Sequence, residues 1–184
     1  MYRKHRISIA IPAHNEERLI GSTLDAVPDL IDAIFVVSDA STDATPEIVR
    51  AKAEQDSRIV LIEHEKNMGV GQAIITGYER SSDEGYDLCV VTGGDHQMPM
   101  EQIPNLLDPL VDDQADYTKG NRFLMPDVGL DDMPWTRFVG NAMISIMTKI
   151  ASGFYKIFDV VDGFTAITKR AIDMIDWDQA WKGY

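Results

Sequence analysis

Cysteine, positive charge and long apolar segments are all scarce in this chain of 184 residues. The single cysteine, Cys89, cannot close an internal disulfide and lies in an apolar stretch, so we expect a small buried hydrophobe rather than a nucleophile. Lys and Arg number 17 against 30 Asp and Glu, which gives a formal net charge of −13. Phosphate contacts need a basic surface, so this composition argues against a general nucleic-acid binder and indicates a solvated acidic surface.

No stretch approaches the roughly 20 apolar residues of a membrane-spanning helix. The first apolar run, residues 7–13, contains Pro12 and meets Glu16 and Glu17 at once, so it predicts a buried strand rather than a signal sequence. The composition, 45% hydrophobic and 26% charged, is typical of a folded globular chain. We expect residues 1–184 to form a single domain.

Strand and helix patterns alternate along the chain up to about residue 120. Strands are expected at 7–11, 33–37, 58–62, 87–92 and 116–120, and helices at 17–26 (with Asn15 or Glu16 near its cap), 45–55, 71–80 and 101–111. This alternation predicts βαβ units and an α/β fold with a parallel sheet. Ligands of such sheets bind at the carboxyl ends of the strands, so the loops after Ile11, Val37, Ile62 and Thr92 are the candidate site.

The pattern changes after Arg122, where residues 123–134 are typical of a loop. A longer helix is predicted over 135–152, and its apolar residues recur at helical spacing: Phe138, Ala142, Ile146 and Ile150. Core packing is the expected role of these residues, and an amphipathic surface resting on a membrane is the alternative. A strand at 164–168 and a helix from Lys169 follow.

Polar turns follow the first two predicted strands. The segment 12–17, Pro-Ala-His-Asn-Glu-Glu, can hold a nucleotide, although helix capping by Asn15 explains it equally well. Asp39 ends the second apolar strand, where a carboxylate can accept hydrogen bonds from a base or a ribose. Thr42 and Asp43 are expected to cap the following turn.

Glycine-rich turns follow the next two strands. The segment 67–71 lacks the third glycine of a dinucleotide fingerprint, so its amides, Gly69 included, either face a phosphate or form a tight turn. Two glycines precede Asp95, His96 and Gln97, and a carboxylate at this point is well placed to hold a divalent ion that bridges a diphosphate. His96 is expected to be a surface residue.

Charged residues in the last third of the chain suggest anion and sugar contacts. Arg122 follows a predicted strand in a very acidic protein, and with Arg137 it could clamp an anion, although each could equally form a surface ion pair. Asp159 and Asp162 precede the last predicted strand, where they could orient sugar hydroxyls or form a turn.

Taken together, the order and spacing of these segments resemble the family 2 glycosyltransferases, which have the nucleotide-diphospho-sugar transferase (GT-A) fold. Within the family the chain looks most like the dolichyl- or polyprenyl-phosphate sugar transferases, the dolichyl-phosphate mannosyltransferase-like group. The matching segments cover almost the whole chain: 9–16, 36–43, 67–71, 94–97, 119–123 and 159–167.

The resemblance implies a reaction and a set of roles. A hexose would pass from a nucleotide diphosphate sugar, GDP- or UDP-linked, to a polyprenyl phosphate, with inversion at the anomeric carbon. Peripheral contact with the cytoplasmic face of a membrane would follow from the lipid acceptor. The implied residues are Pro12, His14, Glu16, Asp39 and Gly69 for the nucleotide, Asp95 and Gln97 for Mg²⁺ or Mn²⁺ and the diphosphate, Arg122 and Arg137 for the acceptor phosphate, and Asp159 and Asp162 for the sugar. Asp95, Arg122 and Asp159 would be catalytic.

The chain departs from the family pattern in three places. The usual Asp-x-Asp metal motif has Gly93 in place of its first acid, so weaker metal binding is expected. The acidic pair after the second strand is Ser38-Asp39, which leaves the choice of nucleotide open. The chain also ends at Tyr184, before the further segments, often membrane segments, with which such relatives continue. A transferase acting on a hydroxyl acceptor and a non-catalytic nucleotide-sugar-binding module therefore remain alternatives.

Overall fold

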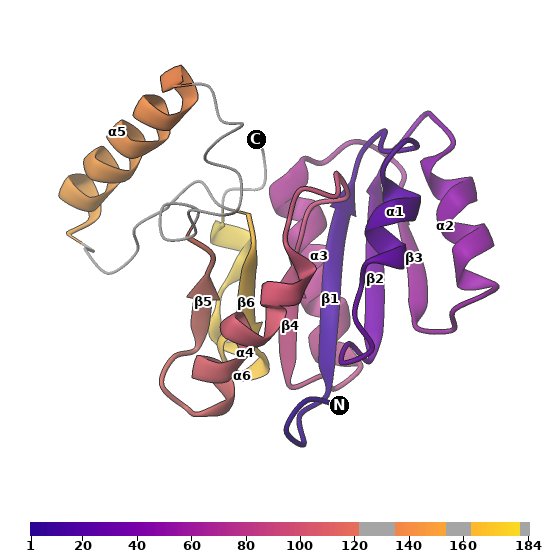
Figure 1. Ribbon diagram of the computed structural model, residues 1–184, viewed down its shortest axis with the longest axis horizontal. Coiled ribbons are helices and arrows are strands. Elements are labelled where there is room, and N and C mark those ends of the chain that lie inside the picture. Colours follow the sequence, from indigo (N-terminus) through magenta and orange to yellow (C-terminus); the bar gives the residue numbers. More distant parts are fainter. Residues whose placement is uncertain (122–134, 154–162, 181–184) are drawn as a thin grey trace.

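A six-stranded sheet forms the centre of the computed structural model, which describes residues 1–121, 135–153 and 163–180 (Figure 1). The strand order is β3-β2-β1-β4-β6-β5. The strands are β1 Ile7–Ala13, β2 Ala33–Asp39, β3 Ile59–His64, β4 Leu88–Val91, β5 Tyr117–Lys119 and β6 Thr165–Thr168. The first four run parallel, as the alternating pattern predicted, while β6 pairs antiparallel with both β4 and β5.

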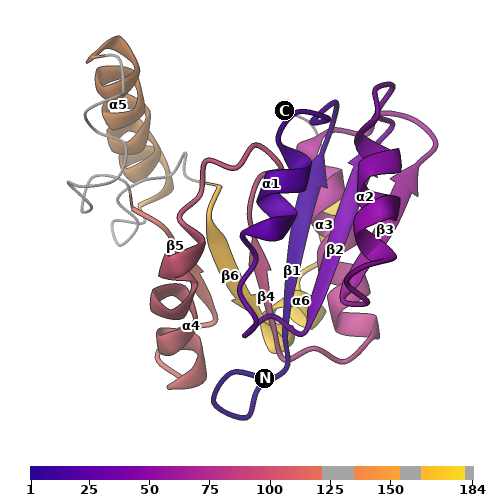
Figure 2. The same ribbon diagram turned by 45° about the vertical axis from the view of Figure 1, so that its right-hand side comes forward.

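Helices cover both faces of this sheet, with α1 and α2 on one face and α3 and α6 on the other (Figures 1 and 2). The helices are α1 Ile20–Asp25, α2 Thr45–Ala53, α3 Val70–Asp83, α4 Ile103–Val111, α5 Trp135–Ser152 and α6 Lys169–Met174, and 3₁₀ turns lie at Met100–Gln102 and Trp177–Gln179. The α/β prediction is therefore confirmed. Pro46 lies in the first turn of α2, where its fixed φ favours a helix start.

The core lies on both sides of β1 because neighbouring strand residues point to opposite faces of the sheet. Ile9 and Ile11 pack with Ile20 of α1 on one face. Ala10 packs on the other face, in a cluster that also contains Cys89. Cys89 is fully buried, as expected, and burial raises the pKa of its thiol to about 11. It is therefore protonated near neutral pH and unsuited to nucleophilic chemistry.

The first helix begins later than the sequence indicated. It starts at Ile20, and its N-cap residue, Leu19, makes no side-chain capping bond. The expectation that Asn15 or Glu16 caps this helix was wrong: Asn15 adopts a left-handed backbone conformation with φ 57°, and its side chain accepts a hydrogen bond from the Thr42 amide. The residues after β1 are thus held by the β2–α2 loop instead of continuing into a helix.

Helix α5 has the predicted bounds but not the predicted packing. Ile146 and Ile150 are 58% and 70% exposed, and in both views α5 lies apart from the sheet (Figures 1 and 2). The prediction that these two residues pack in the core was therefore wrong, since helical spacing gathers apolar side chains on one face without providing a partner for it. The side chains of Phe138 and Ala142 lie outside the described set. Across the described ranges, no helix combines the length and apolar character needed to cross a bilayer.

Candidate active site

The candidate site lies where the sheet changes its winding direction. From β1 the chain moves to β2 and β3 on one side, while β4 lies on the other side of β1. Loops diverge at such a switch point and leave a crevice beyond the carboxyl ends of the strands. A pocket of about 230 Å³ occupies this position, and its described lining residues are Pro12, Ala13, His14, Glu16, Asp39, Val70, Ala73, Gly93, Gly94 and Asp95.

The loop after β1 is fixed by hydrogen bonds to the loop after β2. The Glu16 amide donates to the Thr45 hydroxyl at 2.8 Å, and the Glu17 amide donates to Asp43 at 3.0 Å. Asp43 also accepts a bond from the Thr45 amide, so Asp43 caps this turn as expected, whereas the amide and hydroxyl of Thr42 donate to Asn15 instead. The segment after β1, which lines the pocket, is therefore held in place by residues 42–45, which lie 26 to 29 positions further along the chain.

Three of the six described non-glycine residues with positive φ lie in the loops around the pocket. Asn15, Ala40 and His96 have φ values of 57°, 53° and 54°, in the left-handed region that side chains with a Cβ disfavour. They lie in the loops after β1, β2 and β4 respectively. Strained residues persist only where the surrounding contacts over-determine them, which is common at functional sites.

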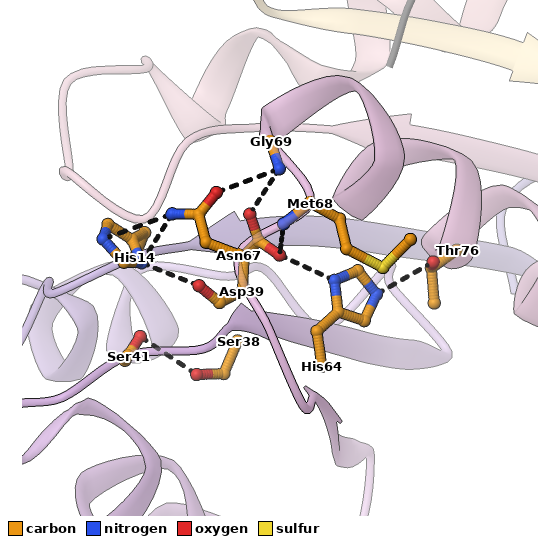
Figure 3. Close-up of polar contacts among 9 residues, drawn as sticks. All are labelled: His14, Ser38, Asp39, Ser41, His64, Asn67, Met68, Gly69 and Thr76. Carbon is orange, nitrogen blue, oxygen red and sulfur yellow. Dashed lines mark hydrogen bonds and ion pairs between the residues drawn. The ribbon is translucent and has the colours of Figure 1, made fainter. Parts of the chain in front are cut away.

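Asp39 is the most extensively bonded carboxylate at the pocket (Figure 3). Its Oδ1 accepts bonds from the Met68 amide at 2.9 Å and the His64 ring at 2.8 Å, and its Oδ2 accepts a bond from the Gly69 amide at 2.8 Å. Burial raises the pKa of Asp39, but these three hydrogen bonds together outweigh burial and hold the pKa below its ordinary value. Asp39 is therefore a charged group that joins β2 to the start of α3.

His64 was missed by the sequence analysis. It ends β3, and the parallel register places it directly beside Asp39 at the end of β2. Because an ionised carboxylate only accepts, the His64 Nδ1–H donates to Asp39, and Nε2 lies within hydrogen-bond distance of the Thr76 hydroxyl, at 3.0 Å. The available signal was that two adjacent parallel strands both end in ionisable residues.

His14 is bound to the same acidic residue through the backbone. Its Nδ1–H donates to the Asp39 carbonyl at 2.7 Å, and the Asn67 side chain lies 3.5 Å from the ring nitrogens (Figure 3). The carbonyl bond fixes the orientation of the ring, whose edge lines the pocket. His14 therefore presents a polar edge to whatever the pocket binds.

Acidic groups face the pocket from the loops after β1 and β4, namely Glu16 and Asp95. Burial raises the pKa of Glu16, and the negative charges of Asp95 and Asp43 raise it further. A Cβ at Gly93 would lie 2.9 Å from Oδ1 of Asp95, the end of a flexible side chain that would have to move aside. Thr23 of α1 donates to the Gly94 carbonyl at 2.9 Å and anchors this loop. A cation placed here would relieve the repulsion between Glu16 and Asp95.

The pocket brings together most of the sequence-predicted nucleotide residues that the structure describes. Its wall includes Pro12, His14, Glu16, Asp39 and Asp95. Gly69 and Gln97 are not part of this wall in the described chain: the Gly69 amide donates to Asp39 instead of facing a phosphate, and Gln97 is exposed. Arg122, Asp159 and Asp162 lie outside the described residues, as does the side chain of Arg137 in α5. Among the described residues, no cluster of three or more His, Cys, Asp or Glu could hold a metal ion by itself.

Residues 8–175 match the family model described as glycosyl transferase family 2. The chain is 30% identical to a UDP-N-acetylglucosamine–dolichyl-phosphate N-acetylglucosaminyltransferase of Methanococcus voltae, covering 97% of this chain and 75% of that protein. It is also 30% identical to an undecaprenyl-phosphate mannosyltransferase of Micrococcus luteus, covering 92% of this chain and 70% of that protein. The chain therefore belongs to glycosyl transferase family 2, and it is an enzyme of the glycosyltransferase class.

Solved structures share the fold. Glucosyl-3-phosphoglycerate synthase from Mycobacterium tuberculosis, crystallised with Mn²⁺, UDP and glucosyl-3-phosphoglycerate, superposes with a TM-score of 0.68 at 19% identity. The match covers 91% of this chain and 58% of the synthase, so this chain spans a little over half of that protein. The predicted GT-A fold is confirmed by this likeness.

Proposed function

We propose that this protein transfers a hexose from a nucleotide diphosphate sugar, GDP- or UDP-linked, to a polyprenyl phosphate, with inversion at the anomeric carbon. The observation that carries the proposal is the pocket at the switch point, which gathers His14, Glu16, Asp39 and Asp95 from three different strand ends. The relatives in archaea and bacteria named above carry dolichyl- and undecaprenyl-phosphate acceptors in their names. We take residues 1–184 as one catalytic domain.

The donor would lie with its nucleoside against His14 and Asp39 and its diphosphate toward Asp95. Mg²⁺ binds proteins through one or two carboxylates and completes its shell with substrate phosphates and water, so Asp95 beside Glu16 fits such an ion without a full cage of protein ligands. Gln97 stays a predicted additional ligand. When bound, the ion would neutralise the charge that develops on the leaving diphosphate.

The acceptor phosphate is already an anionic nucleophile, so the reaction needs positioning more than proton abstraction. Arg122 and Arg137 are the groups we propose for this role, because two guanidinium groups can hold a phosphate in a fixed orientation. Asp159 and Asp162 are proposed to contact the sugar. Should the acceptor be a hydroxyl instead, Asp159 is the candidate base.

Peripheral membrane contact is proposed for α5, at the cytoplasmic face. Five of its apolar side chains are at least half exposed: Met143, Ile144, Ile146, Met147 and Ile150. A lipid acceptor brings the catalytic domain to a bilayer, and an apolar helix face gains free energy there by leaving water. Since the chain carries a net charge of −13, we expect binding to neutral phosphatidylcholine vesicles to exceed binding to anionic ones. Ile146→Ser together with Ile150→Ser should reduce vesicle co-sedimentation, and undiminished co-sedimentation would remove α5 from the contact.

The test of function is sugar transfer to undecaprenyl phosphate in detergent, with UDP- and GDP-sugars as donors and Mn²⁺ or Mg²⁺ present. Asp95→Ala is expected to abolish metal-dependent donor binding and transfer, whereas Asp83→Ala, an exposed aspartate at the far end of α3, should leave both unchanged. Arg122→Ala should reduce use of the phosphate acceptor more than donor binding. Absence of transfer by a folded protein that still binds a nucleotide sugar would favour a non-catalytic binding module.

A further inference from the structure

Asp39 has a limited capacity to accept further hydrogen bonds. A carboxylate oxygen accepts about two bonds, one for each lone pair. Oδ1 already accepts from the Met68 amide and from His64, whereas Oδ2 accepts only from the Gly69 amide (Figure 3). Within the described part of the chain, Asp39 therefore keeps one open acceptor position, on Oδ2. The residue lines the pocket and is only 2% exposed, so little of its surface is open to a ligand.

The two candidate bases, uracil and guanine, differ in the number of hydrogen bonds that they donate to such a carboxylate. Uracil has one imide N–H, flanked by two carbonyl oxygens, and this single donor needs a single acceptor position. The corresponding edge of guanine carries two adjacent donors, N1–H and the N2 amino group, which pair with a carboxylate through both of its oxygens. With Oδ1 filled, one guanine donor would be left without a partner in a buried place, which is costly.

We propose that the donor is a uridine diphosphate sugar, and that His64 is the residue that sets this preference by occupying Oδ1 of Asp39. The inference rests on the proposed function and chooses between the two nucleotides that it leaves open. His64 acts as a positioning residue, since it reaches the base only through Asp39. Its own side chain is 9% exposed and is held on its other nitrogen by Thr76, so the ring cannot readily turn away.

The experiment compares UDP and GDP by calorimetric titration in the presence of Mn²⁺, using the full chain. Wild-type protein is expected to bind UDP at least roughly tenfold more tightly than GDP, the cost of one unpaired donor. His64→Leu and His64→Phe remove the ring donor and should narrow this ratio toward one. His64→Asn restores a side-chain N–H near the position of Nδ1 and should keep the preference. Thr76→Val removes the contact that restrains the ring on its other side, while His64 can still donate to Asp39, so it should narrow the ratio less than His64→Leu or His64→Phe does.

The ratio of affinities separates this proposal from a merely structural role for His64. A structural defect weakens both nucleotides together and leaves the ratio unchanged, and an unchanged ratio in both the Leu and the Phe variants would overturn the role of His64. Equal or tighter binding of GDP by wild-type protein would overturn the uridine assignment while leaving the proposed glycosyltransferase function in place. Binding of neither nucleotide by folded wild-type protein would overturn both.

Discussion

Replacing Gly77 by Ala should force α3 away from β1. A Cβ built at Gly77 lies 2.5 Å from the Cβ of Ala10, whereas ordinary van der Waals contact begins near 3.4 Å. The overlap is about 0.9 Å, and both residues are buried in the centre of the fold, so neither backbone can yield locally. Overpacking of this kind costs about 1–3 kcal/mol, and it is opposed by a gain of about 0.5–1 kcal/mol because Ala is the better helix former.

Gly21→Ala is the matched control for this prediction. Gly21 also lies in a helix, but a Cβ there would meet its nearest neighbour, Ile48, at 3.7 Å, an ordinary contact. We expect Gly21→Ala to raise the free energy of unfolding by up to about 1 kcal/mol and Gly77→Ala to lower it by about 1–2 kcal/mol, measured by urea denaturation with circular dichroism. The start of α3 lines the pocket through Val70 and Ala73, so nucleotide affinity should fall only in the Gly77 variant. Equal or greater stability of Gly77→Ala would refute the close approach of α3 and β1.

Three further predictions follow from burial and charge. The pKa of Glu16 is raised in the folded protein. Glu16 therefore contributes most to stability when it is protonated, below about pH 4, and this contribution is lost as the pH rises through the folded pKa. Glu16→Gln should accordingly raise the melting temperature at pH 7 and not at pH 4. The pKa of Asp39 is lowered, so its charge stabilises the fold above about pH 4 and less below it. Asp39→Asn should lower the free energy of unfolding in urea by about 1–3 kcal/mol at pH 7, because one amide donor loses its acceptor. A loss of stability in this variant that persists undiminished below pH 4 would contradict the role of the charge. Ile146→Ser and Ile150→Ser should change the unfolding free energy by less than about 0.5 kcal/mol, since both side chains are exposed, and a larger loss would show that α5 packs on the domain.

The sequence predicts the fold well because buried parallel strands have a strong local signature. Uninterrupted apolar runs such as residues 33–37 occur where both faces of a strand are covered by helices. The ends of elements were less predictable because they depend on tertiary hydrogen bonds. The start of α1 is the clearest case, since the bond from the Thr42 amide to Asn15 replaces the expected cap. The antiparallel β6 was expected as a strand, but no local pattern encodes its direction.

For the site, the residues that end strands were predictable and their partners were not. Asp39 was predicted because it ends an apolar run, and Asp95 because it follows an apolar strand after two glycines, positions that parallel sheets use for binding. The bond between Asp39 and His64 depends on the register of β2 and β3, and the sequence of either strand alone does not contain it. Similarly, the exposure of α5 depends on what faces the helix, which its own periodicity cannot specify.

The order of strands in the sheet also has a consequence for synthesis on the ribosome. Strand β4 lies at the boundary of the parallel part of the sheet, and its outer edge pairs only with β6, which follows roughly 70 residues later in the chain. Translation proceeds at about 5–20 residues per second, so the nascent chain would expose the edge of β4 for several seconds before β6 emerges. The four residues of β4, Leu88–Val91, are all buried in the folded protein. An open apolar edge is a template for pairing with other chains. Slow translation between residues 92 and 164 should therefore favour aggregation more than an equal delay earlier in the chain.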